Sequence, residues 1–456
     1  MNIQEPVTQA LAEFVATSSL SRIPQGPRKM ADLCLLDWMG AAVAGGREPI
    51  ALPLERTLRG IDRCDHAAVI GSGVRLSAPH AAMLNATLSH VLELDDVHHA
   101  AAVHGSAVVW AAVLAVAQWQ RISAPDATLA FAVGYEVMAR IGLACGQRMI
   151  SENHHPTGVL GYFGAAAAAG RLLGLDATRQ AMAFGIAAGQ AGALTQVRGT
   201  MSKPFFAGHA AHGGILSALM AEQGFVSALD AIEGPQGVLA TFAPQADPRV
   251  VLRELGSRWE LEQNAFKVHA SCAMSHAVVD GVLELRGRHP IDPREVAAIR
   301  LRLFPHASEY LNRPAVADGL AGKFSAQYCA AVALMDGQAQ ESQFTDERAR
   351  DSALAALMQR VHLAPDSAHA LDHASVDIEM LDGRTHRAEV QAVLGSPARA
   401  LSPAELETKF LQLAGKGVGA DGAQALLRKI RRWPDCEIDA LVACTRHHPS
   451  EAEASC

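Results

Sequence analysis

Small and apolar residues recur with helical spacing over more than half of this chain. From Val7 to about Glu262, nearly every long segment carries apolar residues at intervals close to a helical turn, with short breaks rich in Gly, Pro and Asp. Half of all residues are apolar but only 5% are aromatic, so Ala and Gly supply much of the packing surface. Small side chains let helices approach closely, and the pattern therefore predicts a compact all-helical body. The predicted helices are 6–17, 27–44, 78–92, 107–121, 125–149, 157–174, 176–188, 206–223 and 248–255.

The pattern changes after Lys267. Apolar and polar residues alternate from Val296 to Phe304, which is the period of a half-buried strand. A second alternating segment around Ile378 leads into Asp382-Gly383, a good hairpin turn, and a return strand is expected from 385 to 393. Helices are expected at 324–335 and 346–361. This part of the chain predicts a smaller α+β unit.

A length of 456 residues favours two or three domains. We expect a mainly α protein: a large all-α helical domain formed from both chain ends and a smaller α+β lid domain. The first part of the helical domain spans 1–268, the lid 269–400, and the return segment 401–456. Ser402-Pro403 is a typical helix start, and the helix after it could pack back on the first domain.

Composition excludes several classes of protein. The net charge is −8, and no basic run is long enough to bind nucleic acid. The most apolar stretches are Ala-rich and interrupted by His, Gly or Arg, so we expect buried helices and no membrane association. The segment 1–18 lacks the features of a signal peptide, so a cytoplasmic protein is expected. The eight Cys are scattered without a CxxC pair, which predicts neither a disulfide framework nor a zinc site.

The densest polar cluster is Glu93-Leu94-Asp95-Asp96-Val97-His98-His99, followed by His104. It separates two predicted apolar helices and therefore lies on a loop at helix ends, where functional residues concentrate. Three acids and three imidazoles are costly to gather unless they pair or take part in chemistry. The alternative interpretation is a helix cap followed by a solvated loop.

Three other segments could supply a site for an anion. His155 precedes Pro156, which fits the first turn of an apolar helix whose N-terminus could receive an anion. Lys203 is the only Lys between residues 30 and 266, and it precedes another apolar helix. Lys267 lies where the helical pattern ends, a few residues before Cys272. Since the whole chain is acidic, the positive charge that receives an anionic substrate must be local.

Together these motifs resemble the MmgE/PrpD family in order and spacing, over nearly the whole chain. No single motif is specific, but six in succession are. The motifs are Leu76-Ser77-Ala78 through Asn85 to Asp96, Gly134-Tyr135-Glu136 with Arg140, His155-Pro156-Thr157 with Gly161 and Phe163-Gly164-Ala165-Ala166, Lys203-Pro204 with Gly208 and Ala210-Ala211, Phe266-Lys267 with Cys272 and His276, and Lys323-Phe324-Ser325-Ala326-Gln327-Tyr328.

The resemblance implies a homodimer with a site between its helical and lid domains, acting on small anionic carboxylic acids without a metal or organic cofactor. Family members include 2-methylcitrate dehydratase, cis-aconitate decarboxylase and iminodisuccinate epimerase. The matching motifs imply a set of catalytic and substrate-binding residues, of which Lys203 and Lys267 would hold carboxylates, while Asp95 and Asp96 orient histidines or cap helices. The implied site residues are His104, His155, Lys203, Lys267 and Tyr328 for catalysis, and Asp95, Asp96, Lys203 and Lys267 for substrate binding.

The acidic loop departs from the family pattern. Family decarboxylases read Asp-Phe-Asp-Asp-Thr where this chain has Glu93-Leu94-Asp95-Asp96-Val97, and His104 is displaced by one residue. A hydroxyl is lost at Val97 and a side chain lengthened at Glu93, which argues against cis-aconitate decarboxylation. The expected reaction is dehydration of the 2-methylcitrate type, with epimerisation of the iminodisuccinate type as the alternative and cis-aconitate decarboxylation less favoured.

The chemistry that these reactions share needs cations beside a developing negative charge, which Lys203 and Lys267 could supply. His155 would act as general base or acid, with His104 or Tyr328 as its partner, although the two histidines could exchange roles. Two other classes compete: a metal-dependent hydrolase using the His and Asp cluster, for which no familiar metal spacing is present, and a non-catalytic helical anion-binding protein. Cys272 beside Lys267 is a candidate nucleophile, but a packing role is favoured.

Overall fold

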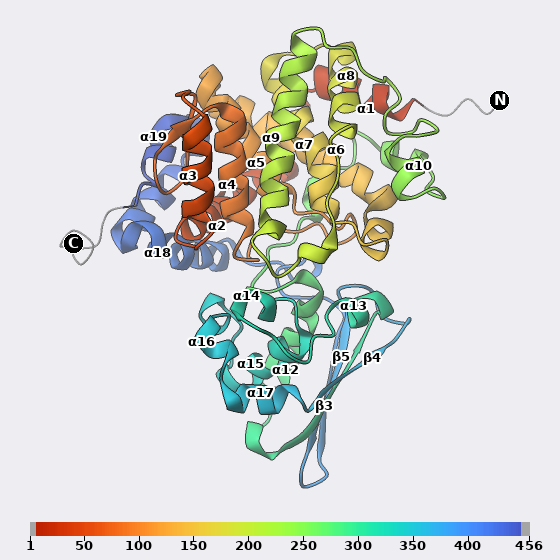
Figure 1. Ribbon diagram of the computed structural model, residues 1–456, viewed down its shortest axis with the longest axis vertical. Helices are drawn as coiled ribbons and strands as arrows, with labels where there is room; N and C mark the ends of the chain where they lie inside the picture. Colours follow the sequence, from red (N-terminus) through yellow and green to blue (C-terminus); the bar gives the residue numbers. More distant parts are fainter. Residues whose placement is uncertain (1–5, 448–456) are drawn as a thin grey trace.

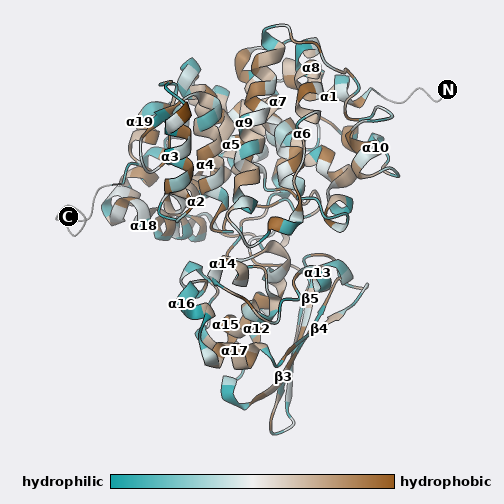
Figure 2. Ribbon diagram, viewed as in Figure 1, coloured by the Kyte–Doolittle hydropathy of each residue, from teal (hydrophilic) through white to brown (hydrophobic). Residues whose placement is uncertain are grey.

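The computed structural model describes residues 6–447 and divides them into a large helical body and a smaller α+β part (Figure 1). The predicted fold class, mainly α with a smaller α+β unit, is confirmed. Residues 1–5 and 448–456, at the ends of the two predicted helical segments, lie outside the described residues. Figure 2 shows hydrophilic residues on outer elements such as α16 and α19, while the central helices are more apolar.

The helical body is built around α4 (Ala78–His90), α5 (Gly105–Gln120), α6 (Ala124–Ser151), α7 (Pro156–Leu173) and α9 (Ser202–Glu222). Glycines permit their close contact: a Cβ on Gly208 of α9 would lie 2.4 Å from the Met83 carbonyl oxygen of α4. The other described α-helices before residue 268 are α1 (Val7–Thr17), α2 (Gln25–Gly45), α3 (Ala51–Ile61), α8 (Ala177–Ala188), α10 (Val238–Phe242) and α11 (Arg249–Leu252), and a two-stranded ribbon pairs β1 (Ala67–Ala68) with β2 (Arg75–Leu76).

Among the described helices, α6 has the length and apolar composition of a membrane span. However, 89% of its most apolar stretch is buried inside the protein. Its apolar surface is therefore used in packing against other helices, as in the core helix of a large domain.

The C-terminal part of the chain returns to the helical body. The long helix α18 (Pro403–Ile430) packs along α2, where Lys409 binds Asp37 with 2.5 Å between Nζ and Oδ1. Trp433 follows α18 and donates to the Thr128 hydroxyl of α6 at 2.8 Å, and α19 (Ile438–Ala443) ends this region. Helices from the beginning and the end of the sequence thus share one hydrophobic core.

The smaller part contains a four-stranded sheet in the order β4-β3-β5-β6. Strand β3 (Val296–Leu303) runs parallel to β4 (Val361–Pro365) and antiparallel to β5 (Ala374–Met380), which pairs with β6 (Thr385–Val390). Ile299 and Leu301 are fully buried, as the alternation predicts. Helices α12 (His276–Arg288) and α15 (Ala326–Asp336) form the core with the sheet, and α13 (Pro305–Tyr310), α14 (Gly319–Gly322), α16 (Asp346–Ala349) and α17 (Ser352–Met358) complete this part, which we call the lid.

Several elements differ from the sequence-based expectations. The predicted helix 346–361 is two short helices, α16 and α17, separated by Arg350 and Asp351, and its last residue begins β4. Asp351 caps α17 by accepting the backbone N–H groups of Ala353 and Leu354, so the chain restarts a helix there. Helices α3 and α12 and strand β4 were not predicted. Strand β4 has only five residues, and its pairing with β3 leaves no local signal in the sequence.

Candidate active site

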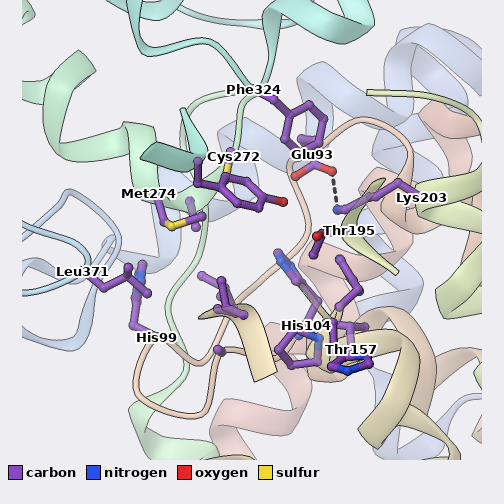
Figure 3. A pocket seen from close by; sticks show the side chains of 18 residues that line it. Glu93, His99, His104, Thr157, Thr195, Lys203, Cys272, Met274, Phe324 and Leu371 are labelled. Carbon is purple, nitrogen blue, oxygen red and sulfur yellow. Dashed lines mark hydrogen bonds and ion pairs between the residues drawn. The ribbon is translucent and has the colours of Figure 1, made fainter. Parts of the chain in front are cut away.

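A pocket lies between the helical body and the lid (Figure 3). It is a narrow cavity with a volume of about 80 Å³. The helical body supplies its histidines and its lysine, and the lid supplies mainly apolar side chains. The lining residues are Glu93, Val97, His99, Ala102, His104, Ile150, His154, His155, Pro156, Thr157, Thr195 and Lys203 from the body, and Cys272, Ala273, Met274, Tyr310, Phe324 and Leu371 from beyond residue 268.

Glu93 joins two lysines that are far apart in the sequence. Its carboxylate binds the Lys203 ammonium through a short contact and the Lys267 ammonium at 3.1 Å (Figure 3 draws the first of these). Burial alone would raise the pKa of Glu93, but the two ammonium groups hold it well below its usual range. Glu93 also has a φ of 58°, a conformation that non-glycine residues rarely adopt and that concentrates at functional sites.

Asp95 lies behind the pocket and fixes two imidazoles. Its Oδ2 is 2.7 Å from Nδ1 of His90 and 3.1 Å from Nδ1 of His104. Burial would raise the pKa of Asp95, but His90 and His104 hold it well below the usual value. On its other side, His90 accepts a hydrogen bond at Nε2 from the Lys203 ammonium at 2.8 Å, so Asp95, His90, Lys203 and Glu93 form one continuous network.

The contacts of His104 determine its tautomer. Nδ1 lies 2.8 Å from the Asp96 backbone oxygen, and since a carbonyl oxygen can only accept, Nδ1 carries the proton. In the neutral ring, Nε2 therefore has a free lone pair. The backbone N–H of His104 donates to the Thr157 hydroxyl at 3.0 Å, which ties the start of α5 to the start of α7. This arrangement suits a general base.

His155 has the opposite tautomer. It is the N-cap of α7, where its Nδ1 accepts the Gly158 backbone N–H at 3.2 Å, so the proton of the neutral ring is on Nε2. Burial, followed by the nearby Lys203 charge, lowers the pKa of His155 well below its ordinary value. His155 thus offers a neutral N–H donor that suits binding a developing oxyanion.

The other predicted residues do not line the pocket. Lys267 reaches it through Glu93, and Asp95 through the two histidines. Asp96 accepts hydrogen bonds from Ser106 and Asn264, which places it at the first turn of α5, and burial raises its pKa to about 7. Tyr328 is buried in the lid core, where its hydroxyl donates to the Gln343 backbone oxygen at 2.6 Å, so its position gives its predicted catalytic role no support.

Some residues at the site were missed by the sequence analysis. His90 looks like the last residue of an apolar helix, and only its spacing of five residues from Asp95 hints at their contact. Tyr310 lines the pocket from the short helix α13, and Arg198 stacks on its ring at 4.1 Å. Lys323 belongs to the last of the six motifs, but no role was predicted for it. Its ammonium donates to the Leu92 backbone oxygen, and burial lowers its pKa to about 8.

The geometry also bears on the competing interpretations. His90, Asp95 and His104 bring ligand-type atoms within 4.8 Å of one another. Their contacts of 2.7 and 3.1 Å are hydrogen-bond distances, whereas two ligands of one tetrahedral zinc ion lie about 3.3 Å apart. Cys272 lines the pocket, but burial, reinforced by Glu93, raises the pKa of its thiol, which favours the packing role over a nucleophile.

Two family patterns match the chain. Residues 9–251 match the MmgE/PrpD N-terminal domain, and residues 269–435 match the MmgE/PrpD C-terminal domain. The boundary between the two matches lies where the helical pattern of the sequence ends.

Individual relatives cover most of the chain at low identity. The cis-aconitate decarboxylase-like protein oryM of Aspergillus oryzae is 28% identical over 92% of this chain and 93% of its own length. The cis-aconitate decarboxylase of Homo sapiens is 29% identical over 84% of this chain and 82% of its own, and that of Aspergillus terreus is 29% identical over 76% and 75%.

Proposed function

The chain belongs to the MmgE/PrpD family and is similar to lyases of that family, and from that premise we propose a reaction in which His104 removes a proton next to a carboxylate of a small di- or tricarboxylic acid. The first candidate is a hydro-lyase reaction of the 2-methylcitrate dehydratase type, without a metal or organic cofactor. The observation that carries the proposal is the position of His104, which lines the pocket while its Nδ1 is held by Asp95 and the Asp96 carbonyl, so that Nε2 is the nitrogen able to accept a proton.

Proton removal creates an enolate-like charge on the neighbouring carboxylate. Lys203 supplies an ammonium group and His155 a neutral N–H donor, and both line the same pocket as His104. The helices that start at His104 and His155 add the partial positive charge of their N-termini. These groups are fixed in place before the substrate binds, which is the condition for effective electrostatic stabilisation.

In dehydration, the C–H bond electrons form the new double bond while the adjacent C–O bond breaks. His104 holds the abstracted proton on Nε2, and the departing hydroxide takes a proton to leave as water. Tyr310 is a pocket-lining phenol, and burial raises its pKa, so it stays protonated and can donate. We therefore assign to Tyr310 the role that the sequence suggested for Tyr328.

Decarboxylation of cis-aconitate is the second candidate, because the curated relatives described above are named for it. That reaction first needs the loss of carbon dioxide and then a proton donor. Dehydration instead begins with proton removal, for which His104 offers Nε2 when its ring is neutral. The chain also has Glu93 and Val97 where family decarboxylases have Asp and Thr.

The decisive experiment incubates the protein with citrate, 2-methylcitrate, cis-aconitate and iminodisuccinate in deuterium oxide and follows each by proton NMR. A new vinyl signal, or for 2-methylcitrate a new signal from a methyl group on a double bond, with all carboxylates retained supports dehydration. New vinyl signals with loss of a carboxylate as carbon dioxide support decarboxylation. Deuterium uptake without net conversion indicates the epimerase alternative. Unchanged spectra for all four after prolonged incubation would contradict the proposal and favour an anion-binding protein.

A further inference from the structure

Two arginines that adjoin the pocket without lining it, Arg198 and Arg313, have no acidic partner among residues 6–447. The guanidinium of Arg198 lies 4.1 Å from the centre of the Tyr310 ring, and Tyr310 lines the pocket. Nε of Arg198 is buried without a hydrogen bond, and neither Arg198 nor Arg313 forms a side-chain hydrogen bond or ion pair with any of residues 6–447. An arginine stacked on a pocket aromatic, with unused donors, is a common arrangement for binding an anion.

The two guanidinium groups come from different parts of the protein. Arg198 belongs to the helical body, just before α9, and Arg313 follows α13 in the lid. A Cβ placed on Gly199 would lie 3.3 Å from Nη1 of Arg313 and 3.8 Å from the pocket residue Phe324, so Arg313 reaches across to the backbone beside Arg198. Burial, reinforced by the nearby Arg198 charge, lowers the pKa of Arg313.

Hydrogen bonds of the main chain fix the backbone at both arginines. The Arg313 N–H donates to Gln327 at 3.1 Å, and its carbonyl accepts from the Ser325 hydroxyl at 2.6 Å. The Arg198 N–H donates to the Thr195 carbonyl at 3.1 Å. Two neighbouring positive charges repel each other, and an anion bound between them would offset that repulsion.

The lysine end of the pocket already has its own counter-ion. Glu93 shares its carboxylate between Lys203 and Lys267, so that end offers only one net positive charge to a ligand. A substrate with two or three carboxylates needs further positive charge, and the arginine pair is a nearby source of it that no described residue neutralises.

From this geometry we infer that Arg198 and Arg313 form a second carboxylate subsite, which binds the carboxylate of the substrate that is remote from the reacting carbon. The inference rests on the proposed function, since it assigns a second anchor to the same carboxylic acid. Because one arginine belongs to each domain, an occupied subsite also joins the lid to the helical body. Substrates with a single carboxylate would lack this anchor.

Binding of inert acids tests the subsite without requiring turnover. Isothermal titration calorimetry would compare tricarballylate with butyrate on the full chain and on Arg198→Gln, Arg313→Gln and the double variant, with exposed Arg179→Gln as the matched control. We expect each single variant to weaken tricarballylate roughly tenfold or more, as loss of a charged hydrogen bond predicts, while butyrate and the control change less than about twofold. Arg198→Lys should recover part of the loss, because it keeps the charge but not the planar fork.

The outcomes separate the two proposals. Unchanged tricarballylate affinity in the double variant, or equal losses for tricarballylate and butyrate, would overturn the subsite while leaving the proposed function intact. A parent protein that binds neither acid would overturn both. Inorganic phosphate distinguishes a free anion from the substrate: competition with tricarballylate supports the subsite, and simultaneous binding of both would show a separate anion site and contradict it.

Discussion

Nδ1 of His104 lies 3.1 Å from Oδ2 of Asp95, and this contact, with the Asp96 carbonyl at 2.8 Å, leaves Nε2 of His104 as the basic nitrogen of the ring. Asp95 is fully buried and also accepts a hydrogen bond from Nδ1 of His90, so one carboxylate orients two imidazoles. Asp95 therefore orients His104, which we propose as the base, although Asp95 itself does not line the pocket.

Replacing Asp95 with Asn should lower kcat by about 100-fold with little change in KM, because the amide no longer stabilises the correct tautomer of His104 or the imidazolium that forms. Steady-state kinetics on the substrate found by NMR would measure this. Exposed Asp421→Asn is the control and should behave like the parent. Equal kcat values for Asp95→Asn and the parent would show that catalysis does not depend on Asp95.

The substitution His155→Asn separates helix capping from catalysis. Asn can accept the Gly158 N–H as His155 does, so α7 should keep its N-terminus, but the Nε2–H donor is lost. We expect a thermal midpoint close to that of the parent and a kcat lower by roughly 100-fold. An active variant with an unchanged kcat would show that His155 serves only as a cap.

Lys203 should matter for both binding and turnover. A Lys203→Ala change removes the donor to His90 and leaves Glu93 with Lys267 alone. We expect kcat/KM to fall by about 100-fold or more, since a buried charge partner is lost together with the cation beside the reacting carbon. Full turnover of the identified substrate by this variant would refute the role of Lys203.

Stability should fall as the pH drops below about 6.5. Burial lowers the pKa of His90 from 6.5 to about 4, so between these values the unfolded chain binds more protons than the folded one. The contribution of this group is fully present above 6.5 and is lost by pH 4, a difference on the order of 3 kcal/mol. Urea unfolding at several pH values from 7 to 4 would give the free energy of unfolding as a function of pH. This dependence should be shallower for His90→Gln than for the parent, and identical dependences would contradict the assignment.

Chelation distinguishes a hydrogen-bonded cluster from a metal centre. If His90, Asp95 and His104 are joined by hydrogen bonds, dialysis against a chelator should leave kcat unchanged, and metal analysis should find no stoichiometric ion. Loss of activity that one added divalent ion restores would revive the metal-dependent alternative.

The sequence predicted the fold class because its signals are local: helical spacing up to Glu262, alternation in Val296–Phe304 and a hairpin at Asp382-Gly383. It also singled out His104, His155 and Lys203, which the structure places around one pocket. Their roles stay predictions, but the pocket gives them a common location.

The rest of the site depends on tertiary contacts without a local signal. Tyr328 lies in a motif, yet its helix turns it into the lid core; Tyr310, on a helix of six residues, reaches the pocket instead. His90 and Arg198 acquire their importance only from partners distant in the sequence, namely Lys203 for the first and Tyr310 for the second. Tautomers, likewise, follow from hydrogen bonds that no spacing reveals.

The central claim is that His104 removes the proton next to a substrate carboxylate. The most direct measurement is the rate at which the identified substrate exchanges that hydrogen with deuterium oxide, compared by proton NMR between the parent and His104→Gln. We predict exchange or conversion in the parent and a loss of at least about 100-fold in the variant, since general-base catalysis supplies that order of rate. Exchange at the parental rate in His104→Gln would contradict this role of His104.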